Sequence, residues 1–455
     1  MEDEFLNNEL IEQFEHMLDY KEQIYFDSEQ LQEIISFYLD VSDFEYAKKA
    51  LHYAFTLHPD NYELKIKQIE FFVSITQLKK AAELIKEIKD IASEDLEYQL
   101  VVARYWAIKS MPKKAIQFYE KALEHGEDLD FIFNCIGNEY LNLEEVSTAL
   151  IYFKQALEYS EDNDFSFYSI IQCYDELHLT NDCIEFLKEY IDENPFSETA
   201  WAQLGLQYEK NKNLEKALEA YDYVTVINPS SITGHMQKAV TLEKLNRFEE
   251  AIQAFEDSLE YDDSPAFTYL KIGECYEKLE LPYKALKAYH LSIKEDPQLD
   301  KVWGKTSNLY SRLENYPEAL FYINRAIELD DNNIEYWKTH CFVLIKIGKY
   351  EEAIESYRTI VEIEPLRINN WLALIEANIV MEEYDTAIKE ALLALIHFNR
   401  AEIYYQLSNC YYSTGEEQLG KTALDNAILL DATLKDEYLL KYPILQKYLS
   451  ISEDE

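Results

Sequence analysis

The chain has 455 residues and a formal net charge of −45, from 87 acidic and 42 basic residues. Such acidity disfavours nucleic acid and anionic membrane surfaces as partners, because both are bound through Lys and Arg. Hydrophobic residues make up 48% of the chain, whereas Gly and Pro number only 9 and 10. This composition disfavours a loop-rich or β-rich protein and favours a large helical core.

Residues 1–27 are predicted to form one amphipathic helix, with Leu10, Phe14, Met17 and Leu18 on one side. The opening stretch MEDEFLNNEL is acidic and lacks the basic and apolar regions of a signal peptide. No run in the chain approaches the roughly eighteen apolar residues of a membrane span. Six Cys are scattered without CxxC spacing, which is typical of reduced thiols. We therefore expect a cytoplasmic protein that binds no membrane.

From residue 28 onward the sequence repeats with a period of 34 residues. Ala217 is the clearest marker, because steps of 34 in either direction lead to a small residue each time. These positions are Ala47, Ala81, Ala115, Ala149, Cys183, Ala251, Ala285, Ala319, Ala353 and Ala387, followed one residue early by Gly420. A fixed period of this length predicts a solenoid of stacked helical units.

The stretch AWAQLGLQYEKNKNLEKALEAYDYVTVINP, residues 200–229, carries the pattern Trp-x-x-Leu-Gly-x-x-Tyr, then Ala-x-x-x-Tyr, then Pro. This pattern resembles the tetratricopeptide repeat family. The resemblance implies an all-α, right-handed α-solenoid in which each repeat is a pair of antiparallel helices. Small residues such as Gly205 and Ala217 are then expected where the two helices cross, because a larger side chain would overpack the contact.

The resemblance covers residues 28–434. Twelve repeats are predicted, starting at residues 28, 62, 96, 130, 164, 198, 232, 266, 300, 334, 368 and 401. Residues 1–27 are interpreted as an N-terminal capping helix, and residues 435–455 as a C-terminal capping helix with an acidic tail. Such caps cover the apolar ends that a solenoid otherwise exposes.

No catalytic, metal or cofactor site is predicted. The Cys residues occupy small packing positions of the repeats, and nothing near them signals a lowered thiol pKa. The nine His residues show no metal-ligand spacing, and no Gly-rich phosphate loop occurs. We therefore expect a protein that is not an enzyme and that needs no cofactor.

Two candidate binding surfaces follow from the resemblance, which implies that positions 2, 5, 9, 12 and 13 of each first helix line a concave groove. In the fourth and fifth repeats these positions form an aromatic and amide set that could bind a peptide or pack on itself: Phe131, Asn134, Asn138, Phe165, Tyr168 and Gln172. A second candidate groove lies in the sixth to eighth repeats: Leu206, Met236, Val240, Leu270 and Glu274. The Glu–Lys pairs beside it, such as Glu209–Lys210, could instead form inter-repeat ion pairs.

The expected function is that of a non-catalytic scaffold or adaptor whose groove binds a protein or peptide, possibly a basic one. The Lys and Asn set with which related co-chaperones hold a C-terminal carboxylate is missing, so chaperone-tail docking is not expected. Two alternatives stay open. One is a structural homo-oligomer built through the convex face or the C-terminal cap, and the other is a regulatory subunit of an enzyme. The sequence leaves the oligomeric state undetermined.

Overall fold

The computed structural model describes residues 2–20, 23–160 and 163–446, and every regular element in these ranges is a helix. The chain divides into two compact units, Met1–Tyr190 and Ile191–Glu455, which are described separately. Most of the predicted acidic tail, residues 447–455, lies outside the described residues. Within the described part, no helix combines the length and the apolar character that crossing a membrane requires.

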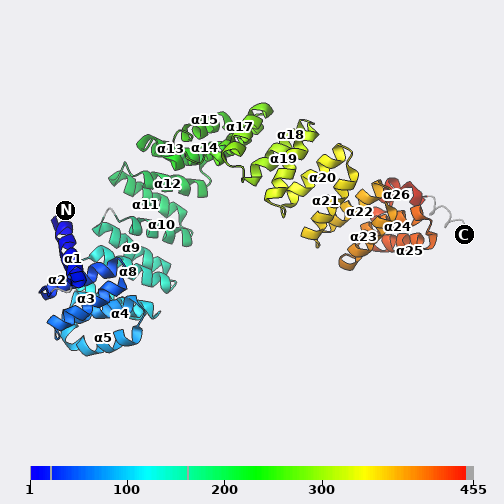
Figure 1. Ribbon diagram of the computed structural model, residues 1–455. Helices are drawn as coiled ribbons and strands as arrows, with labels where there is room; N and C mark the ends of the chain where they lie inside the picture. Colours follow the sequence, from blue (N-terminus) through cyan, green and yellow to red (C-terminus); the bar gives the residue numbers. More distant parts are fainter. Residues whose placement is uncertain (1, 21–22, 161–162, 447–455) are drawn as a thin grey trace. The chain divides into compact units, whose positions relative to one another are not determined.

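The helices form twelve consecutive pairs in the described part of the chain (Figure 1). The first helices of the pairs are α2 (Ser28–Asp40), α4 (Tyr62–Ser74), α6 (Leu96–Ile108), α8 (Leu129–Asn142), α10 (Asp164–Glu176), α12 (Glu198–Lys210), α14 (Ile232–Lys244), α16 (Ala266–Lys278), α18 (Asp300–Arg312), α20 (Ile334–Lys346), α22 (Ile368–Val380) and α24 (Ala401–Thr414). The all-α repeat fold expected from the sequence is therefore confirmed.

The second helices follow each first helix after a short turn. They are α3 (Phe44–Leu57), α5 (Leu78–Ala92), α7 (Pro112–Ala122), α9 (Val146–Tyr159), α11 (Thr180–Glu193), α13 (Leu214–Ile227), α15 (Phe248–Ser258), α17 (Pro282–Glu295), α19 (Tyr316–Leu329), α21 (Tyr350–Ile363), α23 (Tyr384–His397) and α25 (Glu417–Leu430). The remaining elements are α1 (Glu2–Tyr20), α26 (Lys435–Lys441) and two 3₁₀ turns, η1 (Leu123–His125) and η2 (Ala432–Leu434).

Local sequence explains where the first helices begin. The side chains of Asp27, Asn61, Asp95, Ser197 and Ser231 each accept a hydrogen bond from a backbone N–H in the first turn of the helix that follows. Such caps satisfy donors that have no partner inside the helix. The cap residues are spaced by the repeat length, so the same start signal sets the register of successive pairs.

Each pair is held together at a crossing of small residues. Ala217 of α13 is fully buried, and so are the Ala residues at the equivalent place in the other second helices. Opposite it on α12, Gly205 packs against the ring of Tyr221, which is also buried. The small residue on each helix lets the backbones approach, and the ring fills the remaining space. The expectation for Gly205 and Ala217 is confirmed.

Additional helices pack at both ends of the described chain. In the N-terminal unit, Phe14 of α1 is fully buried against the rings of Phe26 and Tyr38. In the C-terminal unit, Tyr438 of α26 stacks on Tyr405 of α24, with ring centroids 4.7 Å apart. These contacts add apolar burial to the first and last pairs.

Candidate functional site

The residues of the predicted aromatic surface lie on α8 and α10, two successive first helices of the N-terminal unit. Phe131, Phe165 and Tyr168 are each about half exposed, at 53%, 52% and 48%. We call these three side chains the aromatic patch. Their helices are joined by side-chain hydrogen bonds, because Asn163 donates to Asp130 at 3.1 Å and Ser166 donates to Asn134 at 2.9 Å.

Packing holds part of the aromatic patch in place. The exposed ring of Phe165 meets the buried ring of Phe153 edge-on, with centroids 6.1 Å apart. Tyr168 meets its buried neighbour Phe167 in the same way at 5.6 Å. A half-exposed ring that is fixed on one edge can offer its other side to a ligand at low entropic cost.

The amides beside the patch differ from one another, and one expectation about them is wrong. Asn134 is only 7% exposed, and its side-chain oxygen accepts the Ser166 hydroxyl, so this amide joins two repeats and does not offer a free acceptor. Asn138 and Gln172 are exposed. Gln172 donates to Glu176 at 2.8 Å. The exposed amides that accompany the aromatic patch are therefore Asn138 and Gln172.

One member of the second candidate groove belongs to the core. Leu270 is 3% exposed and belongs to the same apolar cluster as Tyr289 and Trp303, so it cannot be a groove residue. Met236 and Val240 are partly buried against a neighbouring cluster. Leu206 alone among the four apolar members is exposed. The structure therefore corrects this prediction for Leu270, which stabilises the fold.

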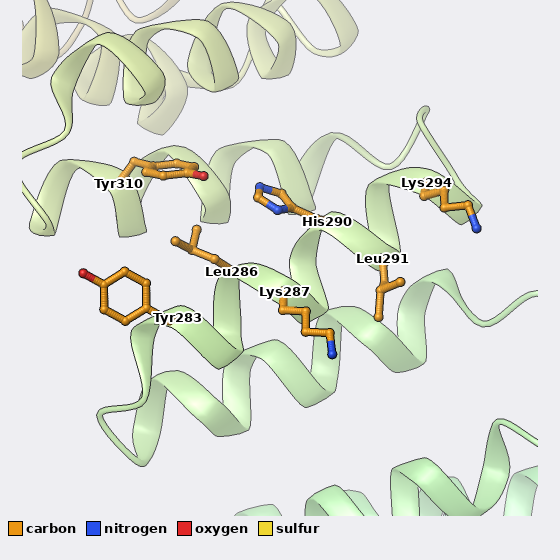
Figure 2. Close-up of a pocket in the computed structure, with 7 residues that line it drawn as sticks. All are labelled: Tyr283, Leu286, Lys287, His290, Leu291, Lys294 and Tyr310. Atoms are coloured by element: carbon orange, nitrogen blue, oxygen red, sulfur yellow. The ribbon is translucent and has the colours of Figure 1, made fainter.

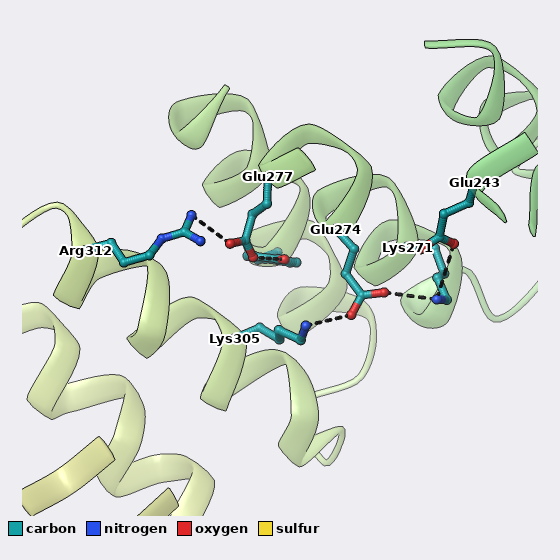
Figure 3. A network of polar contacts seen from close by, with 7 residues as sticks. Glu243, Lys271, Glu274, Glu277, Lys305 and Arg312 are labelled. Atoms are coloured by element: carbon teal, nitrogen blue, oxygen red, sulfur yellow. Dashed lines mark hydrogen bonds and ion pairs between the residues drawn. The ribbon is translucent and has the colours of Figure 1, made fainter. Parts of the chain in front are cut away.

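Glu274, the fifth member, lies in a chain of ion pairs that crosses several repeats (Figure 3). Its carboxylate contacts Lys271 and Lys305, both at 3.0 Å, and Lys271 also contacts Glu243 at 3.5 Å. Burial alone would raise the pKa of the Glu274 carboxyl, but hydrogen bonds from the two lysines lower it overall. This carboxylate is ionised and paired, so it is not available to a ligand.

Inter-repeat ion pairs also account for the Glu–Lys pattern. Lys244 contacts Glu209 of the preceding repeat at 2.5 Å, and Arg312 contacts Glu277 at 2.8 Å. Glu277 also accepts the hydroxyl of the buried Tyr289. Figure 3 shows Arg312 reaching Glu277 across the gap between two repeats. The interpretation of this pattern as a set of inter-repeat ion pairs is confirmed.

A pocket that the sequence reasoning missed lies between α18 and α20. It has a volume of about 450 Å³ and is lined by Asn308, Ser311, Arg312, Lys338, Thr339 and Phe342. We call it the Phe342 pocket. The Phe342 ring is 48% exposed, and Arg312 and Lys338 are also exposed. In a chain with twice as many acids as bases, two cations beside an exposed ring are an unusual local composition.

A second pocket, of about 470 Å³, opens along α17 (Figure 2). Six of its seven lining residues come from that helix, and Tyr310 of α18 closes one side. The ring of His290 stacks on Tyr322 and shares a 3.0 Å hydrogen bond with its hydroxyl. Burial lowers the pKa of His290, so the imidazole is neutral near pH 7 and packs as an aromatic ring.

The thiols have the character of packing residues. Cys173, Cys183, Cys275, Cys341 and Cys410 are buried. Burial raises the pKa of Cys173 to about 11 and that of Cys275 to about 12. A thiol with a raised pKa holds little thiolate and is a poor nucleophile. Within the described residues, no group of His, Cys, Asp or Glu has the arrangement of a metal site.

Comparison with known proteins finds matches of two kinds. The model of the tetratricopeptide repeat matches residues 232–265, 300–333, 342–365 and 401–434. No curated protein matches the sequence. The similar solved structures include three repeat proteins, each matched over part of this chain.

The first of these is MamA, with 16% identity, a TM-score of 0.35, and coverage of 37% of this chain and 92% of MamA. YrrB, a TPR protein described as having an unusual peptide-binding site, is 18% identical with a TM-score of 0.34, over 39% of this chain and 92% of its own. The C-terminal part of a TPR repeat-containing protein from Cytophaga hutchinsonii is 16% identical with a TM-score of 0.42, over 51% and 95%. With TM-scores this low, we draw nothing further about this chain from them.

Four of the predicted repeats are thus recognised directly, in whole or in part, and the same helix pair recurs through the described chain. The periodic small residues lie at the helix crossings, as the repeat pattern requires. Residues 232–265, 300–333, 342–365 and 401–434 are therefore tetratricopeptide repeats, and the resemblance of the chain to that family is confirmed.

Proposed function

We propose that this protein is a non-catalytic scaffold that binds a protein or peptide ligand through the aromatic patch. The observation that carries the proposal is the exposure of Phe131, Phe165 and Tyr168 on successive first helices. Buried rings elsewhere already fill the crossings of these pairs, so three half-exposed rings are not needed for the core. Exposed aromatic clusters of this kind are favourable anchors for protein ligands.

The polar surroundings favour a ligand that carries Lys or Arg next to an apolar side chain. Glu176 is exposed near the patch, and Gln172 and Asn138 can hydrogen-bond a peptide backbone. The net charge of −45 attracts a basic ligand at long range and speeds its encounter. A peptide with basic residues next to an apolar anchor therefore matches both the acid near the patch and the negative net charge of the chain.

The test is a double variant, Phe165→Ala with Tyr168→Ala, compared with the wild type in affinity purification from native lysate. Capture of the main partner should fall at least tenfold, which corresponds to about 1.4 kcal/mol. The matched control is Tyr283→Ala with Phe321→Ala, which removes two exposed rings from second helices. Circular dichroism and thermal melting should be nearly unchanged for both variants.

Equal capture by the patch variant and the wild type would reject the patch as the binding surface. Loss of fold in the patch variant would show that these rings stabilise the core. Light scattering of the purified wild type separates the scaffold from a structural homo-oligomer, because the proposal does not need self-association.

A further inference from the structure

We infer that the Phe342 pocket is a second binding site, which takes an acidic side chain of a protein ligand and stacks an adjoining apolar side chain on Phe342. The inference shares with the proposed function only the assumption that the ligand is a polypeptide. It concerns other residues, in the other unit of the chain, and the opposite charge preference.

The ends of successive first helices carry a row of cations. Five successive first helices, α12 to α20, each end on a basic residue: Lys210, Lys244, Lys278, Arg312 and Lys346. A cation at this place is favourable in itself, because the carbonyl end of a helix carries partial negative charge. The row alone therefore indicates no ligand.

An acid precedes the terminal cation in only three of these five helices. In α12, α14 and α16 the residue before the terminal cation is Glu209, Glu243 and Glu277, whereas α18 has Ser311 and α20 has Ile345 at that place. Glu209 and Glu277 pair with the terminal cation one repeat further on, Lys244 and Arg312. The middle acid, Glu243, pairs with Lys271 instead. The same one-repeat step pairs Lys346, at the end of α20, with position 311 of α18. That position holds Ser311 in place of an acid.

The surroundings of Ser311 are consistent with a missing carboxylate. Its hydroxyl oxygen is buried and has no hydrogen-bond partner in the described part of the chain. Among the described residues, Lys346 forms no ion pair, and its ammonium lies 5.5 Å from the centre of the Phe342 ring. A donor and a cation thus remain at the place where the preceding repeats have an acid.

The pocket is open at this place, and its lining adds two more cations. Arg312 and Lys338 both line it, together with Ser311 and the exposed ring of Phe342. The nearby acids are already paired: Glu277 contacts Arg312 and Tyr289, and Glu335 contacts Lys338 at 2.7 Å. Arg312 keeps further N–H donors after its single contact with Glu277, and a guanidinium can bind a carboxylate through two of them.

The chemistry selects one class of occupant. A basic ligand would face Arg312 and Lys338, the two cations that line the pocket, and would be repelled. A purely apolar ligand would leave the Ser311 hydroxyl without a partner, which costs free energy in a buried site. An Asp or Glu side chain accepts hydrogen bonds from the cations and from Ser311, and a neighbouring Phe or Leu can cover the ring of Phe342.

The probe for the test is an N-acetylated, C-amidated fluorescent peptide with Glu residues on both sides of a Phe. Amidation removes the terminal carboxylate, so only side-chain acids can occupy the pocket. Fluorescence anisotropy with the full-length protein should show saturable binding below about 1 mM, the range of a weak single-site contact. A peptide with Gln in place of every Glu should bind at least tenfold more weakly, and so should the Gln peptide with a free carboxyl end.

The decisive variant is Ser311→Glu, which supplies the missing acid from within the protein. It should weaken binding of the Glu peptide at least tenfold. The matched control Ser311→Gln introduces a side chain of nearly equal size without the charge, and it should weaken this binding much less. Arg312→Gln and Phe342→Ala should each weaken binding at least fivefold. Unchanged circular dichroism and melting will show that these variants are folded.

Three results would overturn the inference. The first is the absence of saturable binding of the Glu peptide to the wild type. The second is equal loss of binding in Ser311→Glu and Ser311→Gln, which would indicate steric blocking without charge recognition. The third is binding of the free-carboxyl Gln peptide as tightly as the Glu peptide, which would identify a chain terminus as the ligand.

Failure here and failure of the proposed function can be told apart. The patch variant Phe165→Ala with Tyr168→Ala should bind the Glu peptide as the wild type does, because its substitutions lie in the other unit. If the Glu peptide binds but the patch variant captures its lysate partner normally, the patch is rejected and the Phe342 pocket stands. If the Glu peptide does not bind but the patch variant loses its lysate partner, the Phe342 pocket is rejected and the patch stands.

Discussion

The ring of Tyr221 occupies the space into which a side chain on Gly205 would project. A Cβ placed on Gly205 would lie 2.5 Å from Cε1 of that ring. Gly137 and Phe153 have the same relationship in the N-terminal unit, with 2.7 Å between the corresponding atoms. In both pairs the glycine is on the first helix and the ring is on the second helix of the same repeat. The distance between the two helices where they cross is therefore set by an aromatic ring that packs directly against the backbone of a glycine.

This relationship predicts the effect of Gly205→Ala. The methyl group would force the buried Tyr221 ring to move, at about 1–3 kcal/mol for overpacking. The higher helix propensity of Ala recovers up to about 1 kcal/mol. We expect a lower urea midpoint, and we expect Tyr221→Leu to reduce the effect of the Ala because the smaller side chain leaves room. Additive losses in the double variant would contradict the proposed contact.

The turn between the two helices of each pair contains a second regularity. One residue of this turn has a positive φ in all twelve pairs of the described chain, the middle one of three in the first eleven turns and the first one in the last turn: Ser42, Thr76, Ser110, Glu144, His178, Lys212, Asn246, Glu280, Glu314, Gly348, Glu382 and Gly415. Only two of these are Gly. The left-handed conformation costs other L-residues roughly 1–2 kcal/mol, so the turns are strained at ten places.

We therefore expect Glu280→Gly to stabilise the protein. Glu280 is exposed with a φ of 57°, so the substitution removes backbone strain without removing packing. Glu280→Ala is the matched control, because it removes the same charge and keeps the Cβ. The Gly variant should unfold with a free energy about 0.5–1 kcal/mol higher than the Ala variant in urea titrations. Equal stability of the two variants would show that the turn is not strained.

The helix crossings and the turns differ in how well the sequence alone predicts them. The spacing of Ala217 and its equivalents was sufficient to predict the helix pairs, because the small residue recurs at every crossing. The strained turns could not be predicted, since Glu280 and Lys212 have no preference for a positive φ.

The candidate sites were harder to predict, because the same repeat position has different exposure in different repeats. At the fifth position of the first helix, Tyr168 and Lys338 are exposed, but Asn134 and Leu270 are buried. Asn134 is covered because the small Ser166 of the next repeat packs over it and donates its hydroxyl to the Asn134 side-chain oxygen. Exposure at this position depends on the neighbouring repeat, and family register alone does not supply that information.

The chain of ion pairs predicts that two acids contribute different amounts to the free energy of unfolding. Glu277→Gln should lower the free energy of unfolding by about 1–3 kcal/mol, because Glu277 holds both Arg312 and the hydroxyl of the buried Tyr289. Glu249→Gln, at an exposed position in α15, makes the same change in net charge. It should change the free energy of unfolding by less than about 1 kcal/mol, since the loss of an acid from the first turn of a helix is opposed by reduced repulsion within a chain of charge −45. Similar losses in both variants would contradict a specific role for Glu277.

Buried tyrosines predict a loss of stability at alkaline pH. Burial raises the pKa of Tyr289, and the adjoining Glu277 carboxylate raises it further. Tyr442 is affected in the same way by burial and by Glu376, and burial raises the pKa of Tyr438 to about 12. In the unfolded chain these groups ionise near pH 10. Their raised folded pKa values therefore stabilise the protein fully below about pH 10, and this stability is lost as the pH rises toward the folded values.

We expect the urea midpoint to be flat between about pH 8 and 9.5 and to fall steeply above about pH 10. Ultraviolet absorbance of phenolate should rise in two stages. Exposed tyrosines ionise at about pH 10, whereas the buried rings ionise only when their surroundings unfold. Tyr289→Phe lowers the midpoint at pH 8 by removing the bond to Glu277, but it should also reduce the alkaline slope, since one fewer ring resists ionisation. An unchanged midpoint up to pH 11, or phenolate absorbance that reaches its full value before unfolding begins, would show that the buried rings are accessible to solvent in the folded protein.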